Sequence, residues 1–539
     1  MTGTRHPGPN RPILDRLAGE RRAGLLDRRT FMALASTFGA GAAIGRPAIA
    51  QTPAGRPGGT LRVAMRVMDI ADPRRFDWTE KGNLARQFCE PLVRWNADYG
   101  FTGELLEGWH VSDDARTYLL RLRRGVTWTN GDIFTADDVI HNIARWCDTT
   151  VEGNSMATRM ASLIDAGTGR LADGAVTRID DNTVRLTLSR PDITLIASMA
   201  DYPALIVHRS HGDDTDLSQR PIGTGPFQLV SLTPGNRAEL RRRTGTWWGG
   251  AVWLDGIRFI DPGVAPADLA VAFEAGQVDM TDETPPQMIA TLDKLGLVKA
   301  AIPTAGTVVA RMRMDTAPYT DKALRNAIQM AVDNTTVLDL GIGGNGIPAE
   351  NHHVAPFHPE YAAIPTPRTD PAAAFAMASA AGHAETAIEL FSVEGDWRAT
   401  TADAIGAMLD AAGFTLERTT ISASAFWNDW TKYPFSITNW APRPLGIQVL
   451  SLAYRTGAPW NETGHSDPDF DALLDRAAGI FDAEAWRGIF AELQTRLQDS
   501  GVIVQPYWRN LTLHHAAGVM GLRIHPGGCL HLANVWLDI

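Results

Sequence analysis

The stretch that decides the fold runs from Leu105 to Asp138 and reads LLEGWHVSDDARTYLLRLRRGVTWTNGDIFTADD. Apolar and polar residues alternate from Tyr118 to Arg123, which is typical of a half-buried strand. Turn residues flank this strand, with Ser112–Asp114 before it and Asn130–Asp132 after it. Thr135, followed by acidic residues in the next turn, predicts the N-cap of a helix. We therefore expect a hairpin and a helix start, and no residue of the stretch has the setting of a catalytic group.

The first 50 residues of the 539-residue chain differ from the rest in charge. They hold eight Arg and three acidic residues, a net charge of +5. The pair Arg28–Arg29 precedes a mild apolar run, and Ala48–Ala50 has the small-x-small pattern of a cleavage site. We expect a twin-arginine export signal at residues 1–50, removed after Ala50, then a Pro/Gly-rich linker at 51–59 and a periplasmic location. The alternative is a disordered basic segment with a chance arginine pair.

Charge and hydropathy disfavour several classes of partner. The chain carries a net charge of −11, and removal of the N-terminal +5 leaves −16. An acidic surface argues against nucleic acid and against anionic lipid. The apolar run from Phe31 to Ile44 is shorter than the roughly 20 residues of a membrane span. We therefore expect a partner that is neither nucleic acid nor a membrane.

Three cysteines, Cys89, Cys147 and Cys529, are too few for a disulfide framework in so long a chain. A single bridge between two of them stays open as an alternative, and the odd count leaves at least one thiol. We expect three buried cysteines that act as small hydrophobic residues.

Beyond the linker, apolar periodicity predicts alternating strands and helices, which is typical of an α/β fold. The expected strands are residues 60–64, 179–188 (with a turn at Asp181–Asn182), 304–314, 388–393, 414–420, 435–440 and 502–508. The expected helices are residues 84–95, 267–276, 324–340, 400–412, 470–479 and 486–497. A G-x-G-x-x-G run at 341–346 follows a helix rather than a strand, so we interpret it as a helix-terminating loop and not as a dinucleotide site.

The opening stretch also resembles a known family through residues spread over its length. They are Trp109, Ser112, Asp114, Thr117, Tyr118, Leu122, Arg123, Gly125, Val126, Gly131, Phe134, Thr135, Ala136, Asp138 and Val139. As a run they are similar to the signature of the extracytoplasmic solute-binding proteins of ABC transporters, family 5, the peptide/nickel group. Gly223–Phe227 and Trp247–Gly250 match further elements of that family, and the resemblance extends from Thr60 to Trp536.

The resemblance implies a two-lobed, periplasmic-binding-protein-like α/β fold of type II, in the large class with an extra subdomain in lobe one. Lobe one would comprise residues 60–303 and 506–539, and lobe two residues 304–505. Such a protein closes on a peptide-like or other small organic ligand and delivers it to an inner-membrane ABC permease. We expect a monomer with no cofactor, no resident metal and no catalytic activity.

The strongest site candidate is the segment from Asn439 to Pro444, which follows a buried strand. Trp440 is similar to a Trp that peptide-binding members carry, and in those members an Asp three residues later pairs with the α-amine of the ligand. Arg443 stands at that position here. A guanidinium group suits a carboxylate or phosphate, so we expect a ligand with an acidic group. The alternative is a solvated loop residue.

Further candidate contacts come from both expected lobes. Trp460 and Asn461 of lobe two have side chains that could cover a ligand face and fix a polar group, and packing is an equal alternative. Asp69, Phe76 and Phe88 are the expected contacts of lobe one.

Two other interpretations stay open. An exported hydrolytic or metal-dependent enzyme would use the histidines at 352, 353, 358, 514, 515, 525 and 531 as candidate ligands, although adjacent histidines point apart on a strand. The resembled family includes binders of nickel complexes, so a metal-complex ligand also stays open. The third interpretation is a receptor that serves a sensor instead of a permease.

Overall fold

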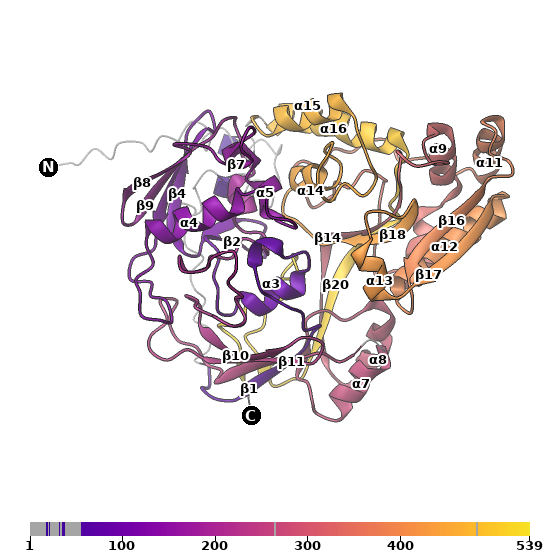
Figure 1. The fold of residues 1–539 in the computed structure, drawn as a ribbon. Helices are drawn as coiled ribbons and strands as arrows, with labels where there is room; N and C mark the ends of the chain where they lie inside the picture. The colour runs from indigo at the N-terminus through magenta and orange to yellow at the C-terminus, as the bar shows by residue number, and fades with distance from the viewer. Residues whose placement is uncertain are drawn as a thin grey trace.

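The computed structural model describes residues 55–263, 266–480 and 483–538, together with residues 18, 19, 21, 32 and 35–37. The predicted export signal and the first part of the predicted linker thus lie almost entirely outside the described residues. The described chain forms two bodies, and two long strands, β14 (Val298–Met312) and β20 (Tyr507–His515), run between them (Figure 1). This arrangement confirms the two-lobed α/β fold.

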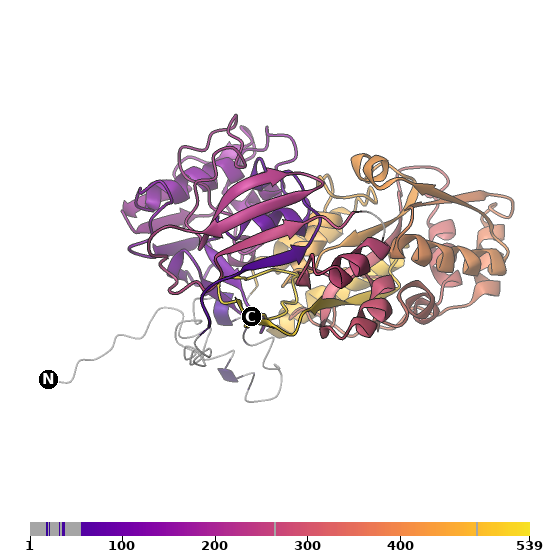
Figure 2. The ribbon, with the colours of Figure 1, turned by 90° about the horizontal axis from the view of Figure 1, so that it is seen from below.

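One sheet of 12 strands connects the two bodies. Along the sheet the order is β10 (Phe227–Thr233), β11 (Arg237–Arg242), β12 (Gly256–Ile260), β1 (Thr60–Ala64), β13 (Met280–Thr281), β20, β14, β18 (Phe435–Trp440), β16 (Ala387–Val393) and β17 (Thr415–Ile421). The two remaining strands are β15 (Gly346–Pro348), which pairs with β20, and β19 (Ile503–Val504), which pairs with β14. After β20 the chain returns to the N-terminal body, where its C-terminal end lies (Figure 2).

β14 belongs to both bodies. Its residues Val298–Pro303 pair with β20, and its residues Thr307–Met312 pair with β18. The pairing with β20 shifts register between Pro303 and Thr307. This irregularity lies at the predicted division between the lobes at residues 303 and 304, which stays a prediction.

The stretch from Leu105 to Asp138 forms the predicted hairpin and helix start. β4 (Leu106–Val111) and β5 (Thr117–Leu122) pair antiparallel. α4 (Ala136–Trp146) begins after Thr135, and the Thr135 backbone N–H donates to Asp138 Oδ2 at 2.9 Å in a capping box. β9 (Thr183–Thr187) and β8 (Val176–Asp180) extend the hairpin to four strands, and α4 packs on them (Figure 1).

The predicted helix at residues 84–95 is wrong. α3 (Thr79–Ala85) ends where that helix should begin, and β2 (Val93–Trp95) follows and pairs with β3 (Phe101–Gly103). Pro91 has no backbone N–H and cannot continue a helix, which accounts for the break. The same apolar run therefore contains a turn and a short strand.

Two further predictions are wrong in extent. Residues 324–340 form two helices, α9 (Lys322–Ala331) and α10 (Asn334–Ile342), because Asp333 accepts the N–H of Thr335 and caps the second one. Residues 179–188 contain the predicted turn at Asp181–Asn182, but the strand after it is only β9, and residues 179 and 180 end β8. α10 ends at Gly343, with φ 61°, so the glycine run is a helix-terminating loop as predicted.

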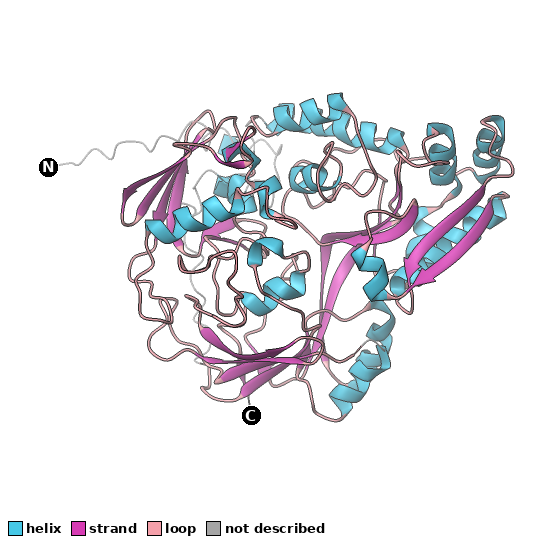
Figure 3. Ribbon diagram, viewed as in Figure 1, coloured by secondary structure: helices cyan, strands magenta, loops and turns pink. Residues whose placement is uncertain are grey.

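The remaining predicted alternation is confirmed except at residues 502–508, where Gln505 and Pro506 separate the short strand β19 from the start of β20. Between β16 and β17 lies α12 (Trp397–Ala412), and helices surround the central strands (Figure 3). The other helices are α5 (Met156–Arg159), α6 (Leu195–Ser198), α7 (Pro266–Glu274), α8 (Ile289–Leu292), α11 (Pro371–Ala380), α13 (Ala423–Asn428), α14 (Gly446–Ala453), α15 (Pro468–Ala477) and α16 (Ala483–Ser500). Within the described ranges, no helix has the length and apolar character to cross a bilayer.

The two bodies touch through a shared apolar cluster. Side chains of α14 and α15 pack with those of β4, β5 and α4 in one buried group. The Ile193 N–H donates to the carbonyl of Ala478 at 3.0 Å, and Arg190 pairs with Asp475 at 3.0 Å. The candidate site lies in this region of contact.

Candidate ligand-binding site

Trp440 is the last residue of β18 and is almost completely buried, with 4% of its surface exposed. The strand ends here because Pro442 cannot donate to a neighbouring strand. The indole Nε1 donates to Glu462 Oε1 at 2.8 Å. The ring meets the rings of Trp460 and His353 edge to face, with centroids 6.1 and 5.5 Å apart. A hydrogen bond and close packing therefore fix its orientation.

Glu462 is the buried acceptor that holds Trp440 in place. It also accepts from Thr438 Oγ1 at 2.7 Å and from Arg311 Nε at 3.1 Å. Burial raises the pKa of Glu462, while the charge of Arg311 and the hydrogen bonds oppose the rise. Because Arg311 is itself fully buried, the pair ties β14 to the segment that contains Trp460.

Arg443 lies three residues beyond Trp440 and is only 3% exposed, so the interpretation as a solvated loop residue is wrong. Its Nη1 donates to the carbonyl of Ala441 at 3.0 Å, and its Nε lies 3.6 Å from Asp201 Oδ2. The guanidinium carbon lies 5.9 Å from the Trp440 ring centroid and 5.7 Å from that of Trp460. The cation is thus enclosed by two indoles.

The backbone at Arg443 is held by His358. Nδ1 of His358 accepts the N–H of Ala355 at 2.9 Å, so Nε2 carries the proton and donates to the Arg443 carbonyl at 3.0 Å. Burial lowers the pKa of His358 to about 4, which keeps the ring neutral at neutral pH. This loop therefore supports the position of Arg443.

Asp201 joins two arginines. Nε and Nη2 of Arg159 donate to Asp201 Oδ2 at 2.8 and 2.6 Å, and Arg443 approaches the same oxygen. Burial alone would raise the pKa of Asp201, but the charges of Arg159 and Arg443 outweigh it and lower this pKa. Guanidinium groups stay charged at neutral pH, so the three side chains carry one positive charge in excess. Buried excess charge of this kind favours an anionic partner.

A small cavity lies beside this group. Residues of both bodies line it, among them Trp95, Asp201, Tyr202, Pro442, Pro444 and Cys529. Pro442 and Pro444 flank Arg443 in the sequence. The cavity has a volume of about 10 Å³ and combines apolar walls with the carboxylate of Asp201. A space of this size holds about one water molecule.

Of two other predicted contacts, Trp460 lies next to Arg443 and Asn439 lies within β18. The ring of Trp460 lies between two cations, with Arg159 at 5.4 Å and Arg443 at 5.7 Å from its centroid. Asn439 pairs through its backbone with Val308, and its buried Oδ1 has no hydrogen-bond partner within the described residues. Trp440, Arg443 and Trp460 are thus neighbours, while Asn439 precedes Trp440 in β18 and its side chain points to the other face of the sheet. That these residues bind a ligand stays a prediction.

Asn461 holds its own loop together. Its Nδ2 donates to the carbonyls of Arg455 at 3.0 Å and His465 at 2.8 Å, and its Oδ1 accepts the His465 N–H at 3.0 Å. The hydrogen-bonding groups of this amide are therefore satisfied within the protein. We assign it the role of shaping the loop that carries Trp460.

The predicted contacts of lobe one lie apart from this group. Phe76 and Phe88 are fully buried in the core of the N-terminal body, and Asp69 is exposed. Gly223 and Gly225 pack against the backbone of Phe88, which fixes the inward direction of its ring. The structure does not bring these three side chains to the cavity described above.

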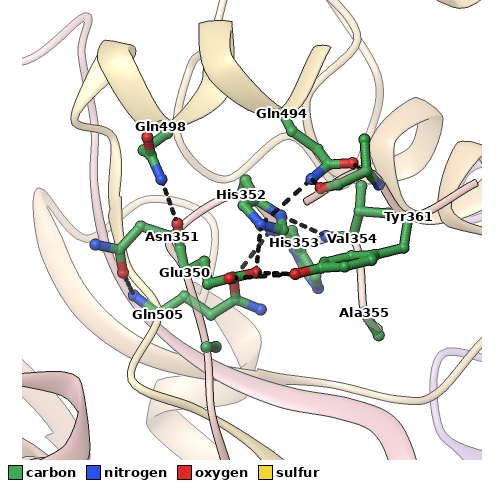
Figure 4. A network of polar contacts seen from close by, with 12 residues as sticks. Glu350, Asn351, His352, His353, Val354, Ala355, Tyr361, Gln494, Gln498 and Gln505 are labelled. Atoms are coloured by element: carbon green, nitrogen blue, oxygen red, sulfur yellow. Dashed lines mark hydrogen bonds and ion pairs between the residues drawn. The ribbon is translucent and has the colours of Figure 1, made fainter. Parts of the chain in front are cut away.

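The histidine-rich loop after β15 makes polar contacts with α16 (Figure 4). His352 Nε2 lies 2.9 Å from Glu350 Oε2, and Tyr361 donates to the same oxygen at 2.9 Å. Gln498 donates to the Glu350 carbonyl at 2.9 Å. Over the described residues, no cluster of three or more His, Cys, Asp or Glu side chains has the arrangement of a metal site. Cys89, Cys147 and Cys529 are free thiols, and Cys89 and Cys147 are buried.

Sequence reasoning missed Asp201, Arg159 and Glu462. Asp201 is the only charged residue in the apolar run Leu195–Val207, LIASMADYPALIV. A charge in such a run is buried and needs a partner, so this signal could have found it. No comparable local signal identifies Arg159.

Comparison with known proteins points to one family. The model of the bacterial extracellular solute-binding proteins, family 5 (middle region), matches residues 100–461. The dipeptide-binding protein DppE of Bacillus subtilis (strain 168) is 24% identical over 491 residues, covering 86% of this chain and 87% of DppE. Several other curated relatives match over about half of their own length.

Solved structures share the fold. DppA from Helicobacter pylori in complex with the peptide STSA has a TM-score of 0.79 at 18% identity, covering 90% of this chain and 99% of DppA. AgaA from A. tumefaciens R10 in complex with agropinic acid has a TM-score of 0.78 at 20% identity, covering 89% of this chain and 99% of AgaA.

The fold is therefore that of a two-lobed binding protein. The chain belongs to the bacterial extracellular solute-binding proteins of family 5, which confirms the resemblance seen in the sequence. This is a family of extracytoplasmic substrate-binding proteins of ABC transporters rather than of enzymes.

Proposed function

We propose that this protein is the periplasmic solute-binding component of an ABC importer. It is exported by the signal at residues 1–50, which is removed after Ala50. It then binds a peptide-like ligand between its lobes as a monomer and presents it, unchanged, to an inner-membrane permease. The names of similar proteins support the ligand class, since DppE is a dipeptide-binding protein and DppA binds the peptide STSA.

The ligand assignment rests on an excess of positive charge at Asp201, where two arginines approach one carboxylate. Arg159 binds this carboxylate closely, while Arg443 is 3.6 Å away and keeps part of its donor capacity. An acidic group of the ligand would complete the hydrogen bonding of Arg443. AgaA, which binds agropinic acid, shares the fold and supports an acidic ligand.

The neighbouring side chains fit the rest of a peptide-like ligand. Trp440 and Trp460 present indole surface on which an apolar part can pack. Among the described residues, the buried Oδ1 of Asn439 has no hydrogen-bond partner, so we propose that it can accept a hydrogen bond from an N–H group of the ligand.

Native mass spectrometry of the protein purified from its host tests the assignment directly. We expect a bound small molecule that contains at least one carboxylate. Repeated turnover assays should return this molecule chemically unchanged. Release of a chemically altered product would show that the protein is an enzyme and not a binding protein. A bound molecule without any acidic group would contradict the proposal that Arg443 recognises an acidic group of the ligand.

Export is tested by sequencing the N-terminus of protein recovered from the periplasm. We expect Gln51 as the first residue, and we expect Arg28→Lys combined with Arg29→Lys to retain the precursor in the cytoplasm. Normal export of the double variant would rule out the twin-arginine route.

A further inference from the structure

Arg86 is buried without a partner among the residues that the structure describes. Its side chain is 9% exposed, and both Nε and Nη2 are fully enclosed. In the described part of the chain, no hydrogen bond or ion pair satisfies its guanidinium group. An unpaired buried charge is strongly unfavourable, so the guanidinium group of Arg86 requires a counter-charge. A bound ligand can supply it.

The other buried arginines differ from Arg86. The ion-paired ones are Arg74 and Arg145 with Asp72, Arg159 with Asp201, Arg311 with Glu462, and Arg509 with Glu283. Arg243, Arg325 and Arg443 donate to backbone carbonyls. Among the buried arginines that the structure describes, Arg86 is therefore the exception.

The end of α3 places Arg86 near Cys529, one of the residues that line the cavity. Asn83 donates to the carbonyl of Gly528 at 2.8 Å and accepts the N–H of Leu530 at 3.0 Å. This holds Cys529 against the helix end that carries Arg86. Cys529 and Asp201 line the same cavity. Arg86 also acts electrostatically on Cys529, where it opposes the rise in the thiol pKa that burial causes.

The charged side chains around the cavity do not balance. Arg159 and Arg443 flank the carboxylate of Asp201, and Arg86 adds a third cation near Cys529, so these groups carry two positive charges in excess. Arg94 is paired with Glu104 and offers no compensation. Burial lowers the pKa of His525 to about 3, so this neighbouring ring is neutral.

We propose that Arg86 is a second anion subsite of the same cleft, so that the ligand carries two acidic groups, one bound at Arg443 and one at Arg86. The proposal rests on the proposed function and narrows its ligand class to short diacids and acidic dipeptides. The apolar spacer between the two acidic groups packs against Ala197 and Ala200, which also line the cavity.

Calorimetry on the ligand-free full-length mature protein tests the proposal with three probes. Ala-Glu carries two carboxylates, Ala-Gln carries one, and succinate is a diacid without a peptide bond. We expect Ala-Glu to bind about tenfold more tightly than Ala-Gln, as the gain of one charged hydrogen-bonded group implies. Arg86→Gln should abolish this preference, and the exposed Arg116→Gln should keep it.

The outcomes separate the two proposals. Equal affinity for both dipeptides, or a preference that survives Arg86→Gln, overturns the second subsite and leaves the proposed function intact. Binding of succinate alone, lost in Arg86→Gln, supports the subsite and overturns the peptide part of the proposed function. Failure of all three probes to bind overturns the subsite, and the proposed function then rests on the molecule found by native mass spectrometry.

The melting temperature of the ligand-free protein gives an independent readout. A side chain that waits for a ligand contributes nothing to the empty fold, so Arg86→Met should leave Tm unchanged or raise it. Arg74→Met, which removes a satisfied arginine, should lower Tm. A lower Tm for Arg86→Met would assign Arg86 a structural role and overturn the proposal.

Discussion

Asp201 Oδ2 lies 2.8 Å from Nε of Arg159 and 3.6 Å from Nε of Arg443. One oxygen is thus shared unequally by two cations, and the weaker partner is the residue that the sequence singles out. Arg159 holds the carboxylate in place, and we propose that Arg443 binds a group of the ligand. This inequality leads to the first predictions.

Replacement of Arg443 should weaken an acidic ligand selectively. Arg443→Gln removes a charged hydrogen bond, so we expect a loss of about 1.5–3 kcal/mol in binding free energy for a carboxylate ligand. Arg443→Lys should recover only part of it, because an ammonium group cannot form the bidentate contact. Calorimetry with Ala-Gln and its C-terminal amide checks this, and equal losses for both would contradict the role.

Replacement of Asp201 should destabilise the fold. Asp201→Asn leaves Arg159 and Arg443 buried without a counter-charge, and we expect the free energy of unfolding to fall by about 3–5 kcal/mol. Asp181→Asn is the matched control, because the Arg178–Asp181 pair is exposed and is worth no more than about 1 kcal/mol. Urea unfolding measures both, and similar small losses would contradict the buried-pair interpretation.

Asp201 should also contribute to acid unfolding. Because its pKa is lowered in the folded protein, its stabilising contribution is complete above the unfolded pKa of about 3.9 and is lost as the pH falls from there through the folded pKa. Asp201→Asn should therefore show a shallower loss of stability than the natural protein below about pH 4. If the unfolding free energies of the two proteins, measured with urea, fall in parallel below about pH 4, the pKa of this carboxyl group does not change on folding.

Glu360 should behave in the opposite way. Burial raises its pKa to about 7, and its Oε2 has no hydrogen-bond partner within the described residues. The fold thus favours the protonated form, and a penalty of about 3 kcal/mol develops as the pH rises from about 4.3 to about 7. Glu360→Gln should equal the natural protein near pH 4 and exceed its stability near pH 8. No gain at pH 8 in urea unfolding would argue against this.

Glu462 should be far more important than its hydrogen-bond partner Thr438. Glu462→Gln removes the counter-charge of the fully buried Arg311, so we expect a loss of about 3–5 kcal/mol in unfolding free energy. Thr438→Val removes one neutral donor and should cost about 1 kcal/mol. Equal costs for the two variants would mean that Arg311 finds enough support in the backbone carbonyls.

The sequence predicted the fold well where periodicity is strict and local. The alternation from Ala387 to Trp440 was recovered because each strand and helix there has its own apolar pattern. The helix expected at 84–95 failed because apolar spacing alone cannot distinguish a helix from a turn followed by a strand. Pro91 and Asp333 carried the missing information, as a helix breaker and a helix cap.

The site was predicted only in part, for a different reason. Trp440 ends β18 and Arg443 lies just after it, so both could be found from a family pattern. Asp201 and Arg159 come from distant segments, and only the packing of the two bodies places them beside Arg443. Phe76 and Phe88 were expected at the ligand, yet the fold uses them as core residues.

The indole rings around Arg443 should make the intrinsic fluorescence of the protein sensitive to ligand binding. Trp430 and Trp460 both meet Trp440 edge to face, at 6.3 and 6.1 Å between ring centroids. Indole emission responds to the electric field at the ring, and here that field comes from the guanidinium groups of Arg159 and Arg443. An anion that enters beside them changes the field, so occupancy of the cleft can be read as a change in the colour and intensity of intrinsic fluorescence, without a label on protein or ligand.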